Sequence, residues 1–280
     1  MRLVADRWPA SPARGIVVLQ HGGGQTRHSW ARTGERLAAS GWTAIAYDAR
    51  GHGESEWHPT GIYNLDGFIA DLLQLIGTLD EAPVLVGASL GGMTALVTAA
   101  EHPGVARALV LVDVVAQMEQ TGIARIRDFL TAHRNGFASL DEVADAIVAY
   151  NPVRSRPRNL DGVRKNVRRH HDGRWYWHWD PALIDIDDEP ARRIDPERRR
   201  AAAANAAIPT LLVRGAQSDV VSEAGMADML SLMPLAETVE IPGTAHMVAG
   251  DDNDLFASTL EAFLDRLPPA AADEQTALAS

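Results

Sequence analysis

The sequence predicts an α/β fold: a mostly parallel, twisted sheet flanked by helices, with an inserted helical cap. Short runs of β-branched and aliphatic residues recur along the chain, and segments with helical spacing separate most of them. One run ends in a tight Gly-x-Ser-x-Gly turn that opens directly into a helix. With 280 residues and 46% hydrophobic content, the chain is long enough for one large domain with an insertion.

The tight turn contains Gly87, Ser89 and Gly91, after a predicted strand over 83–88. Glycine is needed on both sides because the strand and helix backbones approach closely. Such a turn strains the serine, exposes its Oγ and aims the N–H of Leu90 at the same space. The motif also occurs by chance in glycine-rich chains, but the strand before it and the helix after it favour a nucleophile at Ser89 and an oxyanion-hole donor at Leu90.

The N-terminal region supplies an edge strand within 1–13 and a central strand over 15–20, which stops at His21-Gly22-Gly23-Gly24. Consecutive glycines after a buried strand present free N–H groups at the carboxyl edge of the sheet. We therefore expect Gly23 or Gly24 to complete the oxyanion hole. A dinucleotide-binding loop is the alternative, but the third glycine of that fingerprint is missing, so no cofactor is predicted.

The next elements are a helix over 29–40, a strand over 42–47 and a helix that begins after Asn64, its candidate N-cap. The polar loop 48–55, which lies between this strand and the second helix, contains Asp48, Arg50 and His52. Short polar side chains interleaved with glycine commonly hydrogen-bond within their own loop, so we expect a structural role for these three residues.

After a buried strand over 108–113, strand-like runs disappear and charged helical segments take over until 207. One of these helices opens with a capping box at Ser139. We interpret 115–207 as a helical cap over the carboxyl edge of the sheet. Its aromatic segment holds Trp175, Trp177 and Trp179, which either line a substrate pocket or form the core of the cap. The nearby histidines, His178 among them, lack ligand spacing, so we expect no metal site.

The strand pattern resumes over 208–215 and again over 237–243. Asp219 and His246 each follow one of these strands, at the edge of the sheet where Ser89 also emerges and where ligands bind in open α/β sheets. An amphipathic helix over 254–267 closes the fold. The expected organisation is therefore a core over 1–114 and 208–267, the cap over 115–207 and a disordered tail over 268–280.

The composition excludes several classes of protein. The absence of cysteine removes disulfides, thiolate catalysis and thiolate metal sites, and the net charge of −11 argues against a nucleic-acid partner. Apolar runs stay shorter than the roughly 18 residues of a membrane span, and the first residues do not form a signal peptide. We expect a cytoplasmic protein without a membrane partner. The oligomeric state stays open, with a homodimer among the alternatives.

Taken together, these motifs resemble the α/β-hydrolase fold family over nearly all of 14–267. The resemblance rests on His21-Gly22, on the Asp48-x-Arg50-Gly51-x-Gly53-x-Ser55 loop, on Gly87-x-Ser89-x-Gly91-Gly92, and on the later aspartate and histidine. It implies that Ser89 is the nucleophile, His246 the general base and then acid, and Asp219 the partner of that histidine. Asp113, after an earlier strand, is the alternative acid found in some relatives.

A serine nucleophile argues against the similar epoxide hydrolases and haloalkane dehalogenases, in which the resemblance places an aspartate at the turn. The predicted activity is hydrolysis of a small-molecule carboxylic ester or lactone through a Ser-His-Asp triad, as in esterases and lactonases. The alternatives are a cofactor-free haloperoxidase or perhydrolase, an acyltransferase, a carbon–carbon bond hydrolase, and a receptor of the same fold that turns over slowly.

Overall fold

The computed structural model describes residues 1–151, 156, 159–184, 195–248 and 254–268, and it confirms the α/β fold with a mostly parallel sheet. The strands of the main sheet are β1 (Ala5–Trp8), β2 (Ile16–Gln20), β3 (Thr43–Tyr47), β4 (Val84–Ala88), β5 (Ala108–Val112), β8 (Thr210–Gly215) and β9 (Ala236–Ile241). Their order across the sheet is β1-β3-β2-β4-β5-β8-β9. Only the edge strand β1 is antiparallel to its neighbour, so the described sheet is otherwise parallel.

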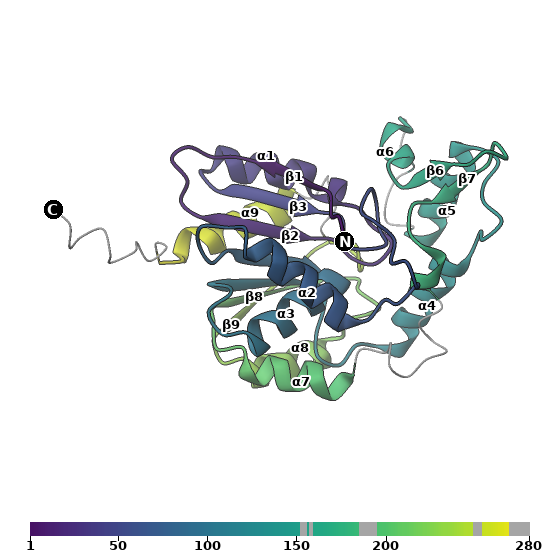
Figure 1. The fold of residues 1–280 in the computed structure, drawn as a ribbon. Helices are drawn as coiled ribbons and strands as arrows, with labels where there is room; N and C mark the ends of the chain where they lie inside the picture. Colours follow the sequence, from purple (N-terminus) through teal and green to yellow (C-terminus); the bar gives the residue numbers. More distant parts are fainter. Residues whose placement is uncertain (152–155, 157–158, 185–194, 249–253, 269–280) are drawn as a thin grey trace.

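Helices cover both faces of this sheet (Figure 1). They are α1 (Ala31–Ala39), which follows a short 3-10 helix η1 (Arg27–Trp30), α2 (Leu65–Ile76), α3 (Leu90–Glu101), α7 (Pro196–Asn205), α8 (Glu223–Leu232) and α9 (Asp254–Arg266). α1 and α9 pack on one face, and α2, α3, α7 and α8 on the other. The predicted N-cap of α2 is confirmed, because Asn64 Oδ1 accepts the N–H of Gly67 at 2.9 Å.

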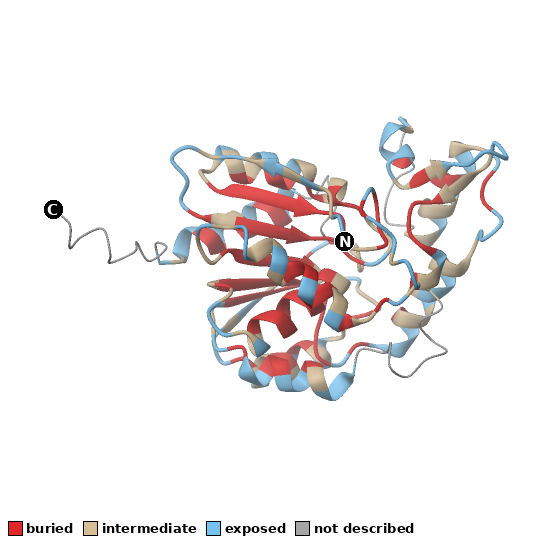
Figure 2. Cartoon of the chain, in the orientation of Figure 1, coloured by how far each residue is buried: buried red, intermediate tan, exposed pale blue. Residues whose placement is uncertain are grey.

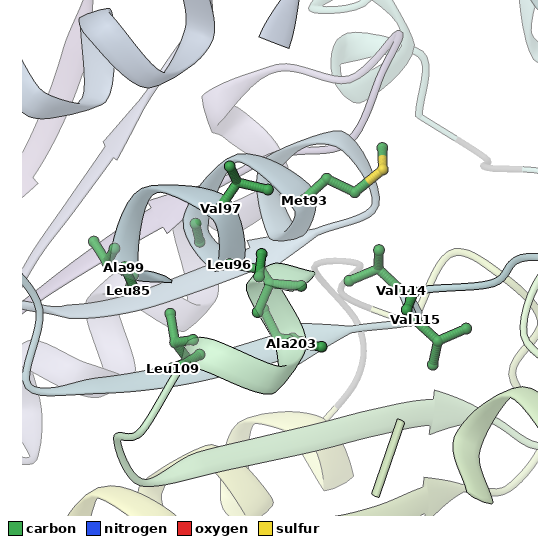
Figure 3. Packing of buried hydrophobic residues seen from close by; sticks show 14 of the residues in the cluster. Leu85, Met93, Leu96, Val97, Ala99, Leu109, Val114, Val115 and Ala203 are labelled. Carbon is green, nitrogen blue, oxygen red and sulfur yellow. The ribbon is translucent and has the colours of Figure 1, made fainter. Parts of the chain in front are cut away.

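Two apolar layers sandwich the central strands, which is why β2, β4 and β5 are nearly continuous buried runs (Figure 2). In one layer, Leu96 of α3 lies in the same cluster as Leu85 of β4, Leu109 of β5 and Ala203 of α7 (Figure 3). α3 is buried on nearly all sides, which fixes the turn that precedes it.

The strand register brings three loops together at one edge of the sheet. Gln20 pairs with Gly87, and Ala88 pairs with Val112, so β2, β4 and β5 all end at the same level. The segments that follow these strands, 21–25, 89–90 and 113–118, therefore leave the sheet side by side. Together with the loop after β9, they form the floor of the candidate site.

The inserted segment lies beyond the carboxyl ends of the strands (Figure 1). Its described elements are α4 (Gln120–Thr131), α5 (Leu140–Tyr150), α6 (Asp161–Arg164), β6 (Val167–Arg169), β7 (Trp175–Trp177) and a 3-10 helix η2 (Pro181–Leu183). Ser139 caps α5 as predicted, accepting the N–H of Glu142 at 3.2 Å.

Two features of this segment differ from the expectation of an all-helical cap over 115–207. β6 and β7 form an antiparallel pair, although the sequence predicts no strand in this segment, and the aromatic residues of β7 are suited to a strand. α7 packs on α3, and its Ala202 and Ala203 lie in the core cluster of the main domain, so this helix belongs to the body of the fold and not to the cap. The described elements above the strand ends thus run from α4 to η2. The expected tail, 268–280, lies outside the described residues except for Pro268.

Candidate active site

Ser89 occupies a strained turn between β4 and α3. Its φ of 48° and ψ of −113° are unfavourable for a residue with a side chain, and such a conformation costs on the order of 1–3 kcal/mol. The flanking glycines are required: a Cβ on Gly91 would lie 2.6 Å from the carbonyl oxygen of Gln20, and one on Gly87 would lie 2.4 Å from the backbone of Gly91. The close approach predicted from the motif is therefore present, and the turn places Ser89 at the carboxyl edge of the sheet.

His246 follows β9, and the structure pairs it with Asp113. The Nδ1 of His246 lies 2.7 Å from Oδ2 of Asp113, whose side chain is completely buried. The same carboxylate accepts the N–H of Gly215 at 3.0 Å and the hydroxyl of Ser218 at 2.6 Å. Because Nδ1 donates to a carboxylate, Nε2 of His246 is the nitrogen that can take up a proton.

The expectation that Asp219 would orient His246 is corrected by this geometry. Asp219 is about one third exposed, and its Oδ2 forms an ion pair with Nη1 of Arg125 from α4 at 2.7 Å. Asp113 directly follows the last residue of β5, at the level where β4 delivers Ser89. Asp219 lies four residues beyond the end of β8, and the chain has turned by then, so Ser218 instead of Asp219 contacts the buried carboxylate.

The two oxyanion-hole candidates from the glycine loop differ in what their N–H groups contact. The N–H of Gly24 donates to Nε2 of His52 at 3.2 Å, so it is already used. The N–H of Gly23 has no acceptor among the described residues, and Gly23 lies on the cavity wall. Leu90 is the first residue of α3, where backbone N–H groups lack intrahelical partners. Gly23 and Leu90 are therefore the two candidate donors.

A cavity of about 310 Å³ opens above this floor and contains both Ser89 and His246 in its wall. Apart from the catalytic candidates and the glycine loop, its lining is mainly apolar: Met93, Ile123, Ile126, Phe129, Leu130, Trp179, Leu183, Ile184, Met247 and Val248. α4 contributes four of these side chains, so one wall of the cavity comes from the segment above the sheet. Burial raises the pKa of Tyr150, another wall residue, to about 12, so its hydroxyl is neutral at physiological pH.

The three tryptophans predicted for the pocket separate into two groups. Trp179 lines the cavity, whereas Trp175 and Trp177 are not among the described residues of its wall. The ring of Trp177 stacks on Trp179 at 4.7 Å and meets Phe137 edge-on at 4.9 Å. Trp177 is thus part of the small core of the cap, and within the described lining Trp179 alone of the three tryptophans reaches the cavity.

In the polar loop after β3, Asp48 and Arg50 have the expected structural contacts, whereas His52 also lies in the cavity wall. The buried carboxylate of Asp48 accepts the backbone N–H of Arg27 at 2.7 Å and pairs with its guanidinium. Arg50 forms a two-pronged ion pair with Asp71 of α2, with both N–O distances at 2.6 Å. These pairs attach the loop to the body of the fold. In the same loop, Nε2 of His52 accepts the N–H of Gly24.

Sequence reasoning misses the role of His178. Its neighbours suggest a solvated histidine, but its side chain is buried and its two ring nitrogens contact Gly53 and Gly24. Burial lowers the pKa of His178 well below its usual value. The only signal is its place between two large aromatic residues in a strand-like run. Within the described residues, no group of three or more acidic or histidine side chains is arranged to hold a metal ion.

The comparisons with known proteins identify the family to which this fold belongs. A family model described as the alpha/beta hydrolase fold matches residues 15–252. The chain belongs to this family. No helix in the described part of this alpha/beta hydrolase is long and apolar enough to cross a membrane.

Two relatives are similar over most of their length. An esterase of Mycobacterium tuberculosis is 32% identical over 80% of this chain and 73% of its own, and its crystal structure superimposes with a TM-score of 0.75, covering 94% and 88% of the two chains. A 2-(acetamidomethylene)succinate hydrolase of Mesorhizobium japonicum is 30% identical over 80% of this chain and 79% of its own. An enol-lactonase structure from Burkholderia xenovorans, 23% identical, has the same fold, with a TM-score of 0.71 over 94% of this chain and 96% of its own.

Proposed function

We propose that this alpha/beta hydrolase is a serine hydrolase that cleaves a carboxylic ester or lactone through an acyl-enzyme. The observation that carries the proposal is the placement of Ser89, in its strained turn, in one cavity wall with His246, which Asp113 orients. A serine hydroxyl needs such a base, and the imidazole needs a carboxylate to fix its tautomer and stabilise its charged form. The similarity to a curated esterase supports the same class of reaction.

In the proposed mechanism, each step is carried out by one of these groups. Ser89 Oγ adds to the carbonyl carbon while Nε2 of His246 takes its proton, and the N–H groups of Leu90 and Gly23 stabilise the resulting oxyanion. Collapse of this intermediate breaks the bond to the alkoxy oxygen, which leaves with the proton from His246. Water then gives a proton to His246 as its oxygen adds to the acyl carbon. The bond between that carbon and Oγ of Ser89 breaks, His246 returns the proton to Oγ, and the acid is released.

The first test is turnover of p-nitrophenyl acetate, butyrate and octanoate by the wild type, with Ser89→Ala as the matched control. We expect steady turnover with a chain-length optimum, because the cavity of about 310 Å³ admits a medium-length chain. Mass spectrometry should locate a transient acyl group on Ser89. Equal turnover by the control variant would refute the proposal.

The alternatives differ in the fate of the acyl-enzyme. An acyltransferase passes the acyl group to an added alcohol or amine, and a perhydrolase passes it to hydrogen peroxide. A receptor of this fold stops after about one slow turnover and retains the acyl group. A carbon–carbon bond hydrolase leaves simple esters largely uncleaved. The same assay, run with and without each acceptor, separates these outcomes from ester hydrolysis.

The apolar wall also favours an uncharged substrate. No Arg, Lys, Asp or Glu lines the described part of the cavity. A carboxylate on the substrate would lose its hydration there without an ionic partner, at a cost of several kcal/mol. The succinate derivative named for the Mesorhizobium relative is therefore a poor guide to the substrate of this chain.

Two esters of matched shape test this preference. p-Nitrophenyl 4-methylpentanoate ends in an isopropyl group, and p-nitrophenyl hemisuccinate ends in a carboxylate of similar size. We expect kcat/KM to be at least about 100-fold higher for the neutral ester, since roughly 3 kcal/mol of desolvation corresponds to that ratio. Comparable values for the two esters would show that a charged group outside the described lining contributes to the cavity.

A further inference from the structure

Three buried histidines surround the glycine loop that supplies the candidate oxyanion donor Gly23. His21 precedes the loop, His52 belongs to the polar loop after β3, and His178 comes from the inserted segment, directly after β7. The ring centroids of His21 and His52 are 5.0 Å apart, and those of His52 and His178 are 6.0 Å apart. None of the three has a role in the proposed proton transfers, although together they hold three consecutive peptide units.

The first peptide unit carries the candidate donor itself. His21 Nδ1 lies 2.8 Å from the carbonyl oxygen of Gly22, and its Nε2 accepts the N–H of Ala49 at 2.9 Å. The acceptor role of Nε2 places the ring proton on Nδ1, which donates to Gly22. The carbonyl of Gly22 and the N–H of Gly23 share one planar trans peptide and point in opposite directions. Holding the carbonyl therefore aims the N–H of Gly23.

The next two peptide units meet at Gly24. The N–H of Gly24 donates to Nε2 of His52 at 3.2 Å, while Nδ1 of that ring donates to the carbonyl of Arg50 at 3.0 Å. The carbonyl of Gly24 lies 3.3 Å from Nε2 of His178, whose Nδ1 accepts the N–H of Gly53 at 2.7 Å. Gly24 has a φ of 73°, and a flexible glycine that follows two other glycines would otherwise sample many conformations.

We propose that His178, acting with His21 and His52, is a positioning residue for the oxyanion hole. Through His178, the inserted segment helps to orient the backbone N–H of Gly23. The proposal rests on the proposed function, because it assigns the loop an oxyanion to bind. His178 also lies between Trp177 and the cavity residue Trp179. The segment that contributes to the cavity wall is thus continuous with the residue that fixes the donor loop.

Two substitutions separate positioning from simple structural support. His178→Gln places an amide nitrogen near the position of Nε2 and keeps donation to Gly24, whereas His178→Asn places an amide oxygen near Nδ1 and keeps only acceptance from Gly53. Each variant loses one hydrogen bond, so their thermal stabilities should be similar. We expect His178→Asn to lower kcat for p-nitrophenyl butyrate by about 10- to 100-fold with little change in KM, since an oxyanion donor acts on the transition state. His178→Gln should stay within about threefold of the wild type.

Hydrogen–deuterium exchange provides a readout that does not require turnover. Amides in the peptide that covers 22–25 should exchange faster in His178→Asn than in the wild type, and His178→Gln should restore protection. Equal kcat and equal exchange in the two variants would overturn the proposal, as would a loss confined to KM. Wild-type protein without Ser89-dependent turnover would refute the proposed function instead, and exchange would still report on the loop.

A second pair covers the case in which His178 variants do not fold. His52→Gln places an amide oxygen near Nε2 and can accept the N–H of Gly24, whereas His52→Asn keeps only the contact with Arg50. The same order is expected, with His52→Asn lower in kcat and faster in loop exchange. The reverse order, or no difference, would contradict the proposal.

Discussion

Asparagine in place of Asp113 should lower kcat for p-nitrophenyl butyrate by about 10³- to 10⁴-fold. The neutral amide cannot stabilise the imidazolium that His246 becomes, and it favours the wrong tautomer of the ring. Asp219→Asn, the matched control, should stay within a few-fold of the wild type, because its carboxylate binds Arg125 at 2.7 Å. The two aspartates follow neighbouring strands, so the comparison tests which of them serves the site.

The measurement is steady-state kinetics of both variants, with Ser89→Ala as the background rate and thermal unfolding as a check on folding. Asparagine keeps an oxygen that can accept the N–H of Gly215, so the loop after β8 retains one of its contacts with position 113. A large loss of kcat in the Asp219 variant, with near-normal activity at Asp113→Asn, would assign the acid of the triad to Asp219. Equal losses would indicate that both carboxylates influence His246.

The parts of the site that depend on local backbone geometry could be predicted from the sequence. The spacing of Gly87, Ser89 and Gly91 dictates a turn that only glycine permits, and the structure has that turn. Asn64 and Ser139 are recognisable as N-caps because a cap depends on residues within one helical turn. Gly87 and Gly91 lie four residues apart, and each N-cap contacts a residue three positions ahead, so these contacts are local. The approach of Gly91 to Gln20 depends instead on the neighbouring strand β2.

The carboxylate that pairs with His246 could not be predicted in this way, because the pairing depends on the path that each loop takes after its strand. Asp113 adopts a φ of 51° immediately after β5, and its buried carboxylate contacts Gly215, Ser218 and His246. No local pattern in the sequence indicates this conformation. The preference for Asp219 rests on its position after a later strand, but in this fold Asp113 contacts His246 and Asp219 pairs with Arg125.

The cap was the hardest region to predict, since its contacts span more than a hundred residues. The hydrogen bond from His178 to Gly24 joins positions 154 apart, and nothing in the composition of the tryptophan-rich segment indicates it. The small antiparallel pair of β6 and β7 could not be predicted for a different reason. Its strands are three residues long, too short for a period of two to be recognised.

Acid should destabilise this protein before its carboxylates begin to titrate. Burial is the main cause that lowers the pKa of His21, His52 and His178, and it brings the pKa of His52 to about 3. The negative charge of Asp48 opposes the lowering of the pKa at His21 and His52, and the positive charge of Arg168 adds to the lowering at His178. One nitrogen of each ring accepts a backbone N–H. Protonation of that nitrogen would place two donors against each other and break the hydrogen bond.

The direction of this effect depends on which state binds the protons. Below pH 6.5 the unfolded chain binds protons at these histidines and the folded chain does not, so the free energy of unfolding falls as pH falls. Well above pH 6.5 both states are neutral at these positions and the contribution is constant. Between pH 7.5 and 5.5, one ring that stays neutral in the folded state accounts for about 1.4 kcal/mol, and three account for up to about 4 kcal/mol.

Urea unfolding at pH 7.5, 6.5 and 5.5 measures this dependence, and His178→Gln is the control. The variant should be less stable at pH 7.5, because it loses the contact with Gly53, but its decline toward pH 5.5 should be smaller by about 1.4 kcal/mol, because one titrating group is gone. A change of less than about 1 kcal/mol in the wild type would mean that the rings accept protons within the fold. In that event, the neutral hydrogen-bond pattern around Gly24 would not persist under acid conditions, and the oxyanion loop would change with it.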